Sequence, residues 1–231
     1  MKFKNLLLAL LLAFSGTYAF SQKVVQIDIK NLLNARIVTT WSNGKLVTWT
    51  DALDNGSSGE ATRTAADKMG NSTALALPDD GIFPANDKHP LVKLNFSNSE
   101  TSGNQVHRSI GVDSFLVKVP KAKYTKIWMF YMSGNGNSAL KVKLKYADGT
   151  IETREIEVPD WYFPVPENET KRCNLAVNLG KWGNDNKMME ADHHYITGID
   201  AQPNPAKALT EVSVIKSQQG VLTLWGVTGV Q

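Results

Sequence analysis

Cysteine is almost absent from this sequence, and its scarcity limits how the chain can be held together. The only cysteine, Cys173, cannot form an internal disulfide, so the fold must rest on its hydrophobic core. A lipoprotein needs a cysteine at the cleavage point of its leader peptide, and Cys173 lies far from that point, so we expect no lipid anchor of this kind. Because a nucleophilic thiolate needs a nearby histidine that the sequence does not place, we predict that Cys173 is half-buried in the fold.

An excess of charge of one sign is also lacking. The chain has 25 basic and 22 acidic residues, and removing Lys2 and Lys4 with a leader leaves a net charge of +1. Binding to a phosphate backbone needs a basic stripe, and none is visible along the chain. The composition therefore argues against nucleic acid as a partner.

Apolar runs long enough to span a bilayer are missing as well. The longest, at residues 5–14, is shorter than the roughly 20 residues of a transmembrane helix. It follows Lys2 and Lys4 and precedes small and polar residues at 15–22, an order typical of secretory signal peptides. We predict a signal peptide at 1–21 and one mature domain at 22–231, either secreted or periplasmic. Cleavage after Ala19 and an uncleaved anchor helix are the alternatives.

Helical periodicity is weak throughout, whereas strand patterns are frequent. Residues 140–146 alternate strictly between apolar residues and lysine up to Tyr146, and Asp148-Gly149 follows before a β-rich run at 150–158. This combination is a strong signal for a β-hairpin. Further strands are expected at 24–30, 91–96, 114–119 and 127–132, and a second hairpin at 210–216 and 221–228. Residues 51–71 are interpreted as a long loop, although 60–69 could form a helical turn or two.

Many short strands separated by turn residues predict an all-β fold, an antiparallel β-sandwich or jelly roll. Several short motifs resemble the galactose-binding-like jelly rolls found in secreted bacterial proteins of polysaccharide utilisation. The motifs are Leu-Pro-x-x-Gly at 77–81, Tyr-x-Asp-Gly-Thr at 146–150, Asp-Trp at 160–161, Asn-Pro-Ala-Lys at 204–207 and a closing strand at 221–228 that ends in Gly-Val-Thr. The resemblance implies a galactose-binding-domain-like fold and a carbohydrate ligand.

Aromatic residues in predicted loops are the first candidates for sugar contacts, since a flat ring can cover the apolar face of a pyranose. Trp161 and Tyr162 begin a dense aromatic run after the return strand, and Trp182 lies in a stretch that reads as a loop. Trp128 and Trp225 fall inside predicted strands and are expected in the core. Packing on the sandwich is the alternative for the loop aromatics.

Asp192 and His194 are the polar candidates at the same site. In a strand, neighbouring side chains point to opposite faces, so His193 and His194 cannot share an ion, whereas Asp192 and His194 can lie together. No third residue has zinc-site spacing. The resemblance implies a structural calcium ion, for which Asp51, Asp54 and Asn55 form one oxygen-rich loop and residues 184–186 another; solvated turns are the alternative.

A non-catalytic carbohydrate-binding protein that recognises an external polysaccharide or oligosaccharide is the preferred function. The predicted ligand-binding residues are Trp161, Tyr162, Trp182, Asp192 and His194. A jelly-roll polysaccharide lyase or other polysaccharide-active enzyme is the first alternative, with His107, Arg108, His194 and Tyr195 as the residues to consider. A structural or interaction subunit of an envelope assembly, with a protein partner, is the second.

Overall fold

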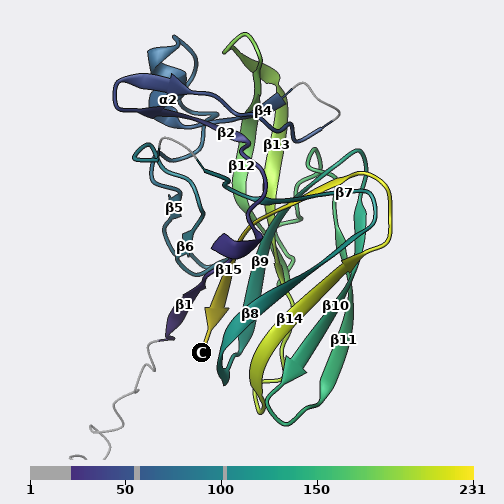
Figure 1. Cartoon of the computed structure of the whole chain (residues 1–231). Coiled ribbons are helices and arrows are strands. Elements are labelled where there is room, and N and C mark those ends of the chain that lie inside the picture. Colours follow the sequence, from purple (N-terminus) through teal and green to yellow (C-terminus); the bar gives the residue numbers. More distant parts are fainter. Residues whose placement is uncertain (1–21, 55–57, 101–102) are drawn as a thin grey trace, which may run out of the picture.

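The computed structural model describes residues 22–54, 58–100 and 103–231, so the predicted signal peptide lies outside the described residues. Strands dominate the described chain (Figure 1). Its elements are β1 (Val24–Ile27), the 3-10 helix η1 (Lys30–Leu32), β2 (Val38–Ser42), β3 (Lys45–Val47), β4 (Ser58–Ala61), α2 (Arg63–Lys68), β5 (Ile82–Phe83), β6 (Val92–Lys93), β7 (His107–Ile110), β8 (Asp113–Lys123), β9 (Lys126–Gly134), β10 (Ser138–Tyr146), β11 (Ile151–Val158), β12 (Arg172–Gly183), β13 (Met188–Asp200), β14 (Ala208–Lys216) and β15 (Val221–Val230).

The strands form two main sheets that pack face to face. The larger sheet has the order β1-β15-β9-β13-β12-β4-β2-β3, with β7 also paired to β15, and the smaller has the order β11-β10-β14-β8. Strands β5 and β6 form a separate short ribbon. Strand pairing is antiparallel except between β2 and β4, which run parallel. The predicted all-β, antiparallel β-sandwich is therefore confirmed.

The core between the two sheets follows the alternation seen in the sequence. Strand β10 buries every second residue from Leu140 to Tyr146 and exposes the lysines between them. It pairs with β11 through the predicted Asp-Gly turn, where Gly149 has φ +83°, a value that side chains with a Cβ disfavour. We call the two facing sheets around this core the sandwich.

Strand β9 is buried on both faces, as its continuously apolar sequence predicts. Ile127, Met129 and Tyr131 point into the core of the sandwich. Trp128 and Phe130 point to the opposite face, into a second core that β5, β6 and the residues near them cover. Trp225 of β15 joins that second core, so Trp128 and Trp225 lie in the interior as expected.

Beyond the sandwich, β2, β3, β4 and α2 gather around residues 179–183 of β12 and 188–194 of β13 (Figure 1). We call this region the cap. Its presence corrects the interpretation of 51–71 as a long loop, because this segment contains β4 and α2. The four residues of β4, Ser-Gly-Glu-Ala, are all buried, but they carry no apolar alternation by which a strand is recognised. The Thr62 side chain caps α2 by accepting a hydrogen bond from the Ala65 N–H.

The predicted second hairpin is wrong. Strand β14 pairs with β10 and β8 in the smaller sheet, whereas β15 pairs with β1, β7 and β9 in the larger one. Residues 217–220 thus carry the chain from one sheet to the other. All ten residues of β15 are buried, so the strand needs cover on both faces and lies inside the larger sheet.

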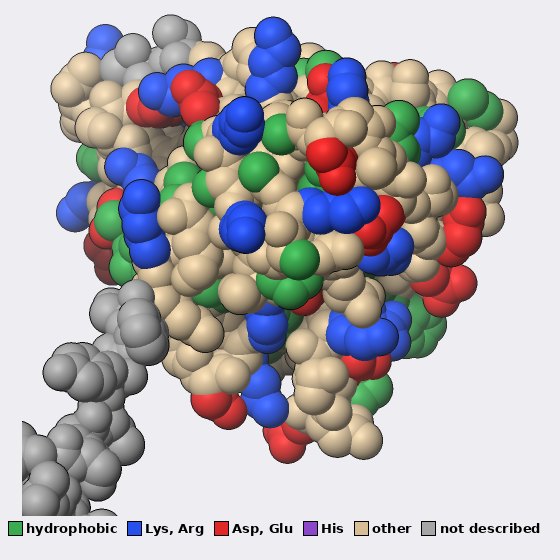
Figure 2. Space-filling model, turned by 90° about the horizontal axis from the view of Figure 1, so that it is seen from below, with side chains coloured by type: hydrophobic (Ala, Val, Ile, Leu, Met, Phe, Trp, Pro, Cys, Tyr) green, Lys and Arg blue, Asp and Glu red, His purple; other side chains and the backbone are tan. Residues whose placement is uncertain are grey.

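The surface charges, the helices and Cys173 can each be compared with a sequence-based expectation. Basic and acidic side chains are interspersed over the face in Figure 2, without a stripe of either sign. The helices that the structure describes are too short or too polar to cross a membrane.

Cys173 is more deeply buried than the predicted half-buried state, and burial raises the pKa of its thiol to about 12, as expected of an inert core residue.

Candidate functional site

Trp161 lies at the junction of the sandwich and the cap, in the segment that follows β11. Its backbone N–H donates to the Ser133 carbonyl of β9, and its carbonyl accepts from the Tyr195 N–H of β13. Its ring packs against the His194 ring at 4.5 Å between centroids. The side chain is only 3% exposed. Trp161 therefore supports the site from below and offers no face for a ligand to stack on.

His194 links Trp161 to a buried carboxyl group in the cap. Its Nε2 is hydrogen-bonded to Oε1 of Glu60, and both side chains are essentially inaccessible. The other ring nitrogen, Nδ1, lies 3.3 Å from the Asp192 carbonyl oxygen. Because a carbonyl can only accept, Nδ1 carries a proton. In the neutral ring Nε2 is then an acceptor, and the bond to Glu60 requires the proton to sit on the carboxyl group.

The environment of Glu60 favours the protonated form of its carboxyl group. Burial raises the pKa of its carboxyl group, against the opposing influence of His194 and the ammonium of Lys181. Its second oxygen, Oε2, has no hydrogen-bond partner. A buried carboxylate without full hydrogen bonding is unfavourable, which is the physical cause of the raised pKa of Glu60.

Tyr162 and Phe163, which follow Trp161, are exposed. Tyr162 is 40% and Phe163 is 63% accessible, and no other aromatic residue in the described chain is classed as exposed. The Tyr162 ring meets Trp161 edge to face at 5.5 Å between centroids. Both backbone N–H groups are fixed by Asp160, through its Oδ1 to Tyr162 and its carbonyl to Phe163. We call Tyr162 and Phe163 the aromatic platform.

Two charged groups border the platform. The Nζ of Lys181 lies 5.1 Å from the ring centroids of both Trp161 and Tyr162, within the range of cation–π attraction. It also forms an ion pair of 3.3 Å with Asp54. Burial acts to lower the pKa of Lys181, but Tyr162 and Asp54 outweigh it and raise the pKa, so the side chain stays charged. Polar groups beside exposed rings are the combination that hydroxylated ligands require.

Two of the predicted ligand-binding residues are placed elsewhere. Trp182 lies in β12 rather than in a loop, and it is fully buried in the core of the cap, on the face opposite Lys181. Expecting it to stack on a sugar was therefore wrong, because the chain turns only after Gly183. Asp192 lies in β13 and takes part through its backbone carbonyl, which faces His194. His193 is exposed and His194 buried, as strand alternation predicts.

The oxygen-rich segments considered for calcium are engaged by the protein itself. Asp51 accepts from the Arg36 N–H and the Thr50 hydroxyl, Asp54 pairs with Lys181, and Asp185 accepts from the Lys187 N–H. Asn55 lies outside the described residues. Within 22–54, 58–100 and 103–231, no three His, Cys, Asp or Glu side chains converge as metal ligands.

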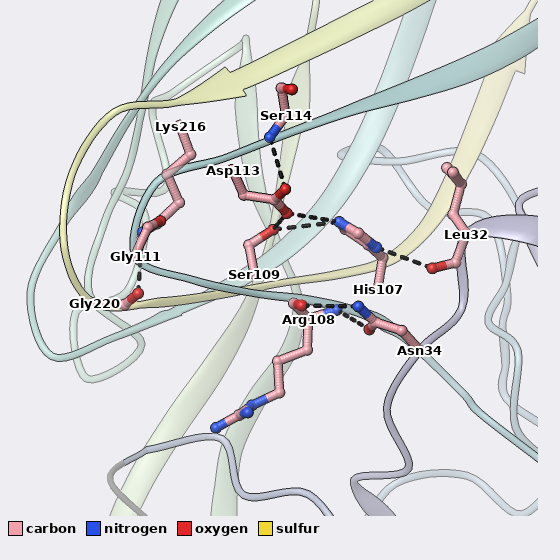
Figure 3. Close-up of polar contacts among 10 residues, drawn as sticks. All are labelled: Leu32, Asn34, His107, Arg108, Ser109, Gly111, Asp113, Ser114, Lys216 and Gly220. Atoms are coloured by element: carbon pink, nitrogen blue, oxygen red, sulfur yellow. Dashed lines mark hydrogen bonds and ion pairs between the residues drawn. The ribbon is translucent and has the colours of Figure 1, made fainter.

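The residues considered for catalysis do not form one centre. His107 lies on β7 and His194 on β13, with β15 and β9 between them, which separates the strands by roughly 14 Å. His107 instead contacts Ser109 and Asp113, as Figure 3 shows. Its Nδ1 donates to the Leu32 carbonyl at 2.9 Å, so Nε2 alone faces both Ser109 and Asp113. In a catalytic triad the serine and the carboxylate meet different ring nitrogens.

Ser109 is also unsuited to act as a nucleophile. Its hydroxyl donates to the Asp113 carboxylate at 2.5 Å rather than to the His107 imidazole, and the residue is 2% exposed. Arg108 and Tyr195 join neither cluster: Arg108 points away from His107 in Figure 3, and the Tyr195 hydroxyl donates to Asn178. His107, Ser109 and Asp113 thus form a structural hydrogen-bond cluster, in which the Ser109 hydroxyl is not activated.

Comparison with known proteins adds no family. Neither a protein-family profile nor a curated protein sequence matches the chain.

Of the five predicted ligand-binding residues, Tyr162 alone is exposed, because Trp161 and His194 are buried beneath it. Sequence reasoning missed Glu60 and Lys181, and it considered Asp54 only for calcium. Glu60 lies in a short strand without apolar alternation, and Lys181 lies in a stretch for which the sequence predicts a loop. One signal was available: strand alternation after Gly180 would have placed Lys181 and Trp182 on opposite faces. The pairing of Glu60 with His194 spans 134 positions and has no local sequence signature.

Proposed function

We propose that this protein is a secreted, non-catalytic carbohydrate-binding protein that binds a polysaccharide or oligosaccharide at the aromatic platform. The observation that carries the proposal is the exposure of Tyr162 and Phe163 on a molecule whose other described aromatic side chains are buried or partly buried. Aromatic rings left in water at a fixed position are typical of binding surfaces. The resemblance to galactose-binding-like modules supports the same ligand class.

The construction of the platform supports binding without a large rearrangement. Asp160 fixes the backbone beneath both rings, and Trp161 fixes the position of Tyr162 from the interior. Trp161 in turn rests on His194, which is hydrogen-bonded to Glu60. A ligand therefore meets a Tyr162 ring that is already held in place and a Phe163 residue whose backbone is fixed, so less free energy is lost in ordering them on binding.

The chemistry of the border defines the ligand further. The two rings can cover the apolar C–H face of a pyranose, while Lys181 and Asp54 can form hydrogen bonds with hydroxyl groups at its edge. We find no reactive constellation at this position, because Glu60 and His194 are sealed beneath Trp161. Binding without cleavage is the activity that this geometry supports.

The first experiment measures binding of the purified protein to a panel of neutral and uronate-containing polysaccharides by calorimetry while following polymer length. The variant Tyr162→Ala/Phe163→Ala should bind the recognised polymer roughly tenfold or more weakly, since each stacked ring contributes about 1 kcal/mol. The control Ile151→Ala removes a similarly exposed apolar side chain, 58% accessible, from β11 and should bind like the wild type.

Each remaining outcome changes the proposal in a defined way. Equal affinity of the double variant and the wild type would reject the platform as the site. Shortening of any polymer would favour the polysaccharide-active enzyme, and absence of binding to the whole panel would favour a protein partner in an envelope assembly.

A further inference from the structure

A lysine occupies a core-facing position at the end of β14. Val212 and Val214 point into the sandwich, and strand alternation places Lys216 on the same face two residues later. Lys216 is 1% exposed, among the most deeply buried side chains in the molecule. A charge at such a position requires compensating partners, because loss of hydration is unfavourable.

The partners are four backbone carbonyl groups. The Nζ of Lys216 donates to Gly111 at 2.7 Å, to Gln218 at 2.7 Å and to Gly220 at 3.0 Å, and Gln219 lies at 3.4 Å. An ammonium group has three hydrogens, so the three short contacts satisfy all of them. We call these four carbonyl groups the carbonyl cage. Figure 3 shows Lys216 reaching between Gly111 and Gly220.

The cage is built by two turns that are fastened to each other. Gly111 lies between β7 and β8 with φ +67°, and Gly220 precedes β15 with φ +99°. The Gly111 N–H donates to the Gly220 carbonyl at 3.0 Å. Conformations of this kind favour glycine, and here they turn carbonyl oxygens toward one point. Residues 217–220 form the passage between the two sheets, so the cage lies where the chain changes sheet.

The spacing of the oxygens identifies the class of cation. Calcium prefers six to eight oxygens at about 2.3–2.6 Å, which is more and closer than the cage provides. Backbone carbonyl rings of this type replace the hydration shell of potassium in channels. Contacts of 2.7–3.0 Å fit an ammonium group. Asp113, the register partner of Lys216, adds a negative charge nearby. Its carboxylate accepts hydrogen bonds from the Ser109 hydroxyl and the Ser114 N–H and contacts His107.

We propose that the carbonyl cage is a monovalent-cation site that Lys216 fills with its own ammonium group, and that the site accepts a free primary ammonium or potassium ion when the side chain is removed. The cation holds the passage from β14 to β15 against the turn between β7 and β8. The carbonyl cage is a different site from the aromatic platform, and its proposed role does not depend on sugar binding.

The test is chemical rescue of Lys216→Ala, followed by thermal unfolding. The variant should lose roughly 5–10 °C in Tm, because the Gly111, Gln218 and Gly220 carbonyl groups lose the ammonium group that joins them. Methylammonium or potassium should then raise its Tm by about 3 °C more than the same concentration of tetramethylammonium, which has no N–H and is too large for the cage. In the wild type and in Lys143→Ala, an exposed lysine on β10, the three salts should act alike.

Lys216→Met separates the cage from a general effect of a cavity. Methionine fills the space without donors and blocks the entry of an ion, so this variant should be destabilised without rescue. Equal responses of Lys216→Ala to all three salts would overturn the proposal.

A measurement on the wild type covers the case in which the alanine variant does not fold. One lysine ammonium should give a slowly exchanging nitrogen-15 signal with magnetisation transfer to the Gly111 and Gly220 region. If every lysine ammonium exchanges as fast as an exposed one, Lys216 is not caged.

Discussion

The sandwich and the cap bury different kinds of side chain. In the sandwich, every second residue of β10 and most inward positions of β8 and β14 are apolar. In the cap, buried positions include Glu60 and His194 together with several threonine and serine side chains. Of the four buried polar atoms without a partner in the described chain, three belong to the cap, on Ser42, Glu60 and Trp182.

This difference shows how the two regions relate to function. Apolar packing stabilises the sandwich without specifying a reactive surface. Buried polar groups reduce stability unless each finds a partner, and they persist where they position other side chains. In this molecule the polar interior of the cap holds Trp161, and Trp161 holds the aromatic platform.

The largest effect is expected from a cavity in the sandwich. Leu144→Ala removes a fully buried side chain of β10 and should lower the free energy of unfolding by about 4 kcal/mol, because the rigid core refills the space only in part. Urea unfolding measures the change. Leu144→Met, which keeps the volume, should cost less than about 1.5 kcal/mol. Equal losses in both variants would show that the interior of the sandwich depends on more than packing.

In the cap, hydrogen bonding should matter more than volume. Glu60→Ala should lower the free energy of unfolding by about 3 kcal/mol, because it leaves His194 buried without its partner. Glu60→Gln should cost about 1 kcal/mol, since the amide N–H can donate to Nε2 as the protonated carboxyl group does. A loss in Glu60→Gln as large as in Glu60→Ala would indicate that the native pair is a carboxylate with an imidazolium.

The smallest effect is a contrast in pH dependence between the two regions. Burial raises the pKa of Glu60, so the native state holds this proton more tightly than the unfolded state, and the group's contribution to stability falls as pH rises above its usual 4.5. For Asp113, burial acts to raise the pKa, but hydrogen bonds from Ser109, Ser114 and His107 outweigh it and lower the pKa below 3.8. Its contribution is therefore present above 3.8 and is lost as pH falls through the lowered pKa.

The matched variants Glu60→Gln and Asp113→Asn isolate these two titrations. In denaturant unfolding across pH, the free energy of unfolding of Glu60→Gln should rise relative to that of the wild type as pH rises. The wild type's advantage over Asp113→Asn should instead disappear in strong acid. Parallel profiles for the two variants would contradict the opposite environments assigned to the two carboxyl groups.

The accuracy of sequence-based expectations differs between the regions for the same reason. Residues 140–158 predict their hairpin because alternation and an Asp-Gly turn are local signals. Strand β4 has no such signal, since its burial depends on partners brought from β2 and β12. The sequence predicts a hairpin for β14 and β15, because a hairpin turn and a connection between two sheets use the same turn residues. The strand partners of β14 and β15, and the contact of Lys216 with the Gly111 carbonyl group, come from residues far apart in the chain.

By itself, the sequence determined the all-β class, the alternating strands of the sandwich and the double burial of β9, because these follow from the period of two along a strand. Only the tertiary structure decided that Trp161 lies beneath the surface while Tyr162 and Phe163 remain on it. It also decided that Glu60 meets His194 and that Lys216 turns inward. Those outcomes depend on contacts between residues far apart in the chain, which no local pattern encodes.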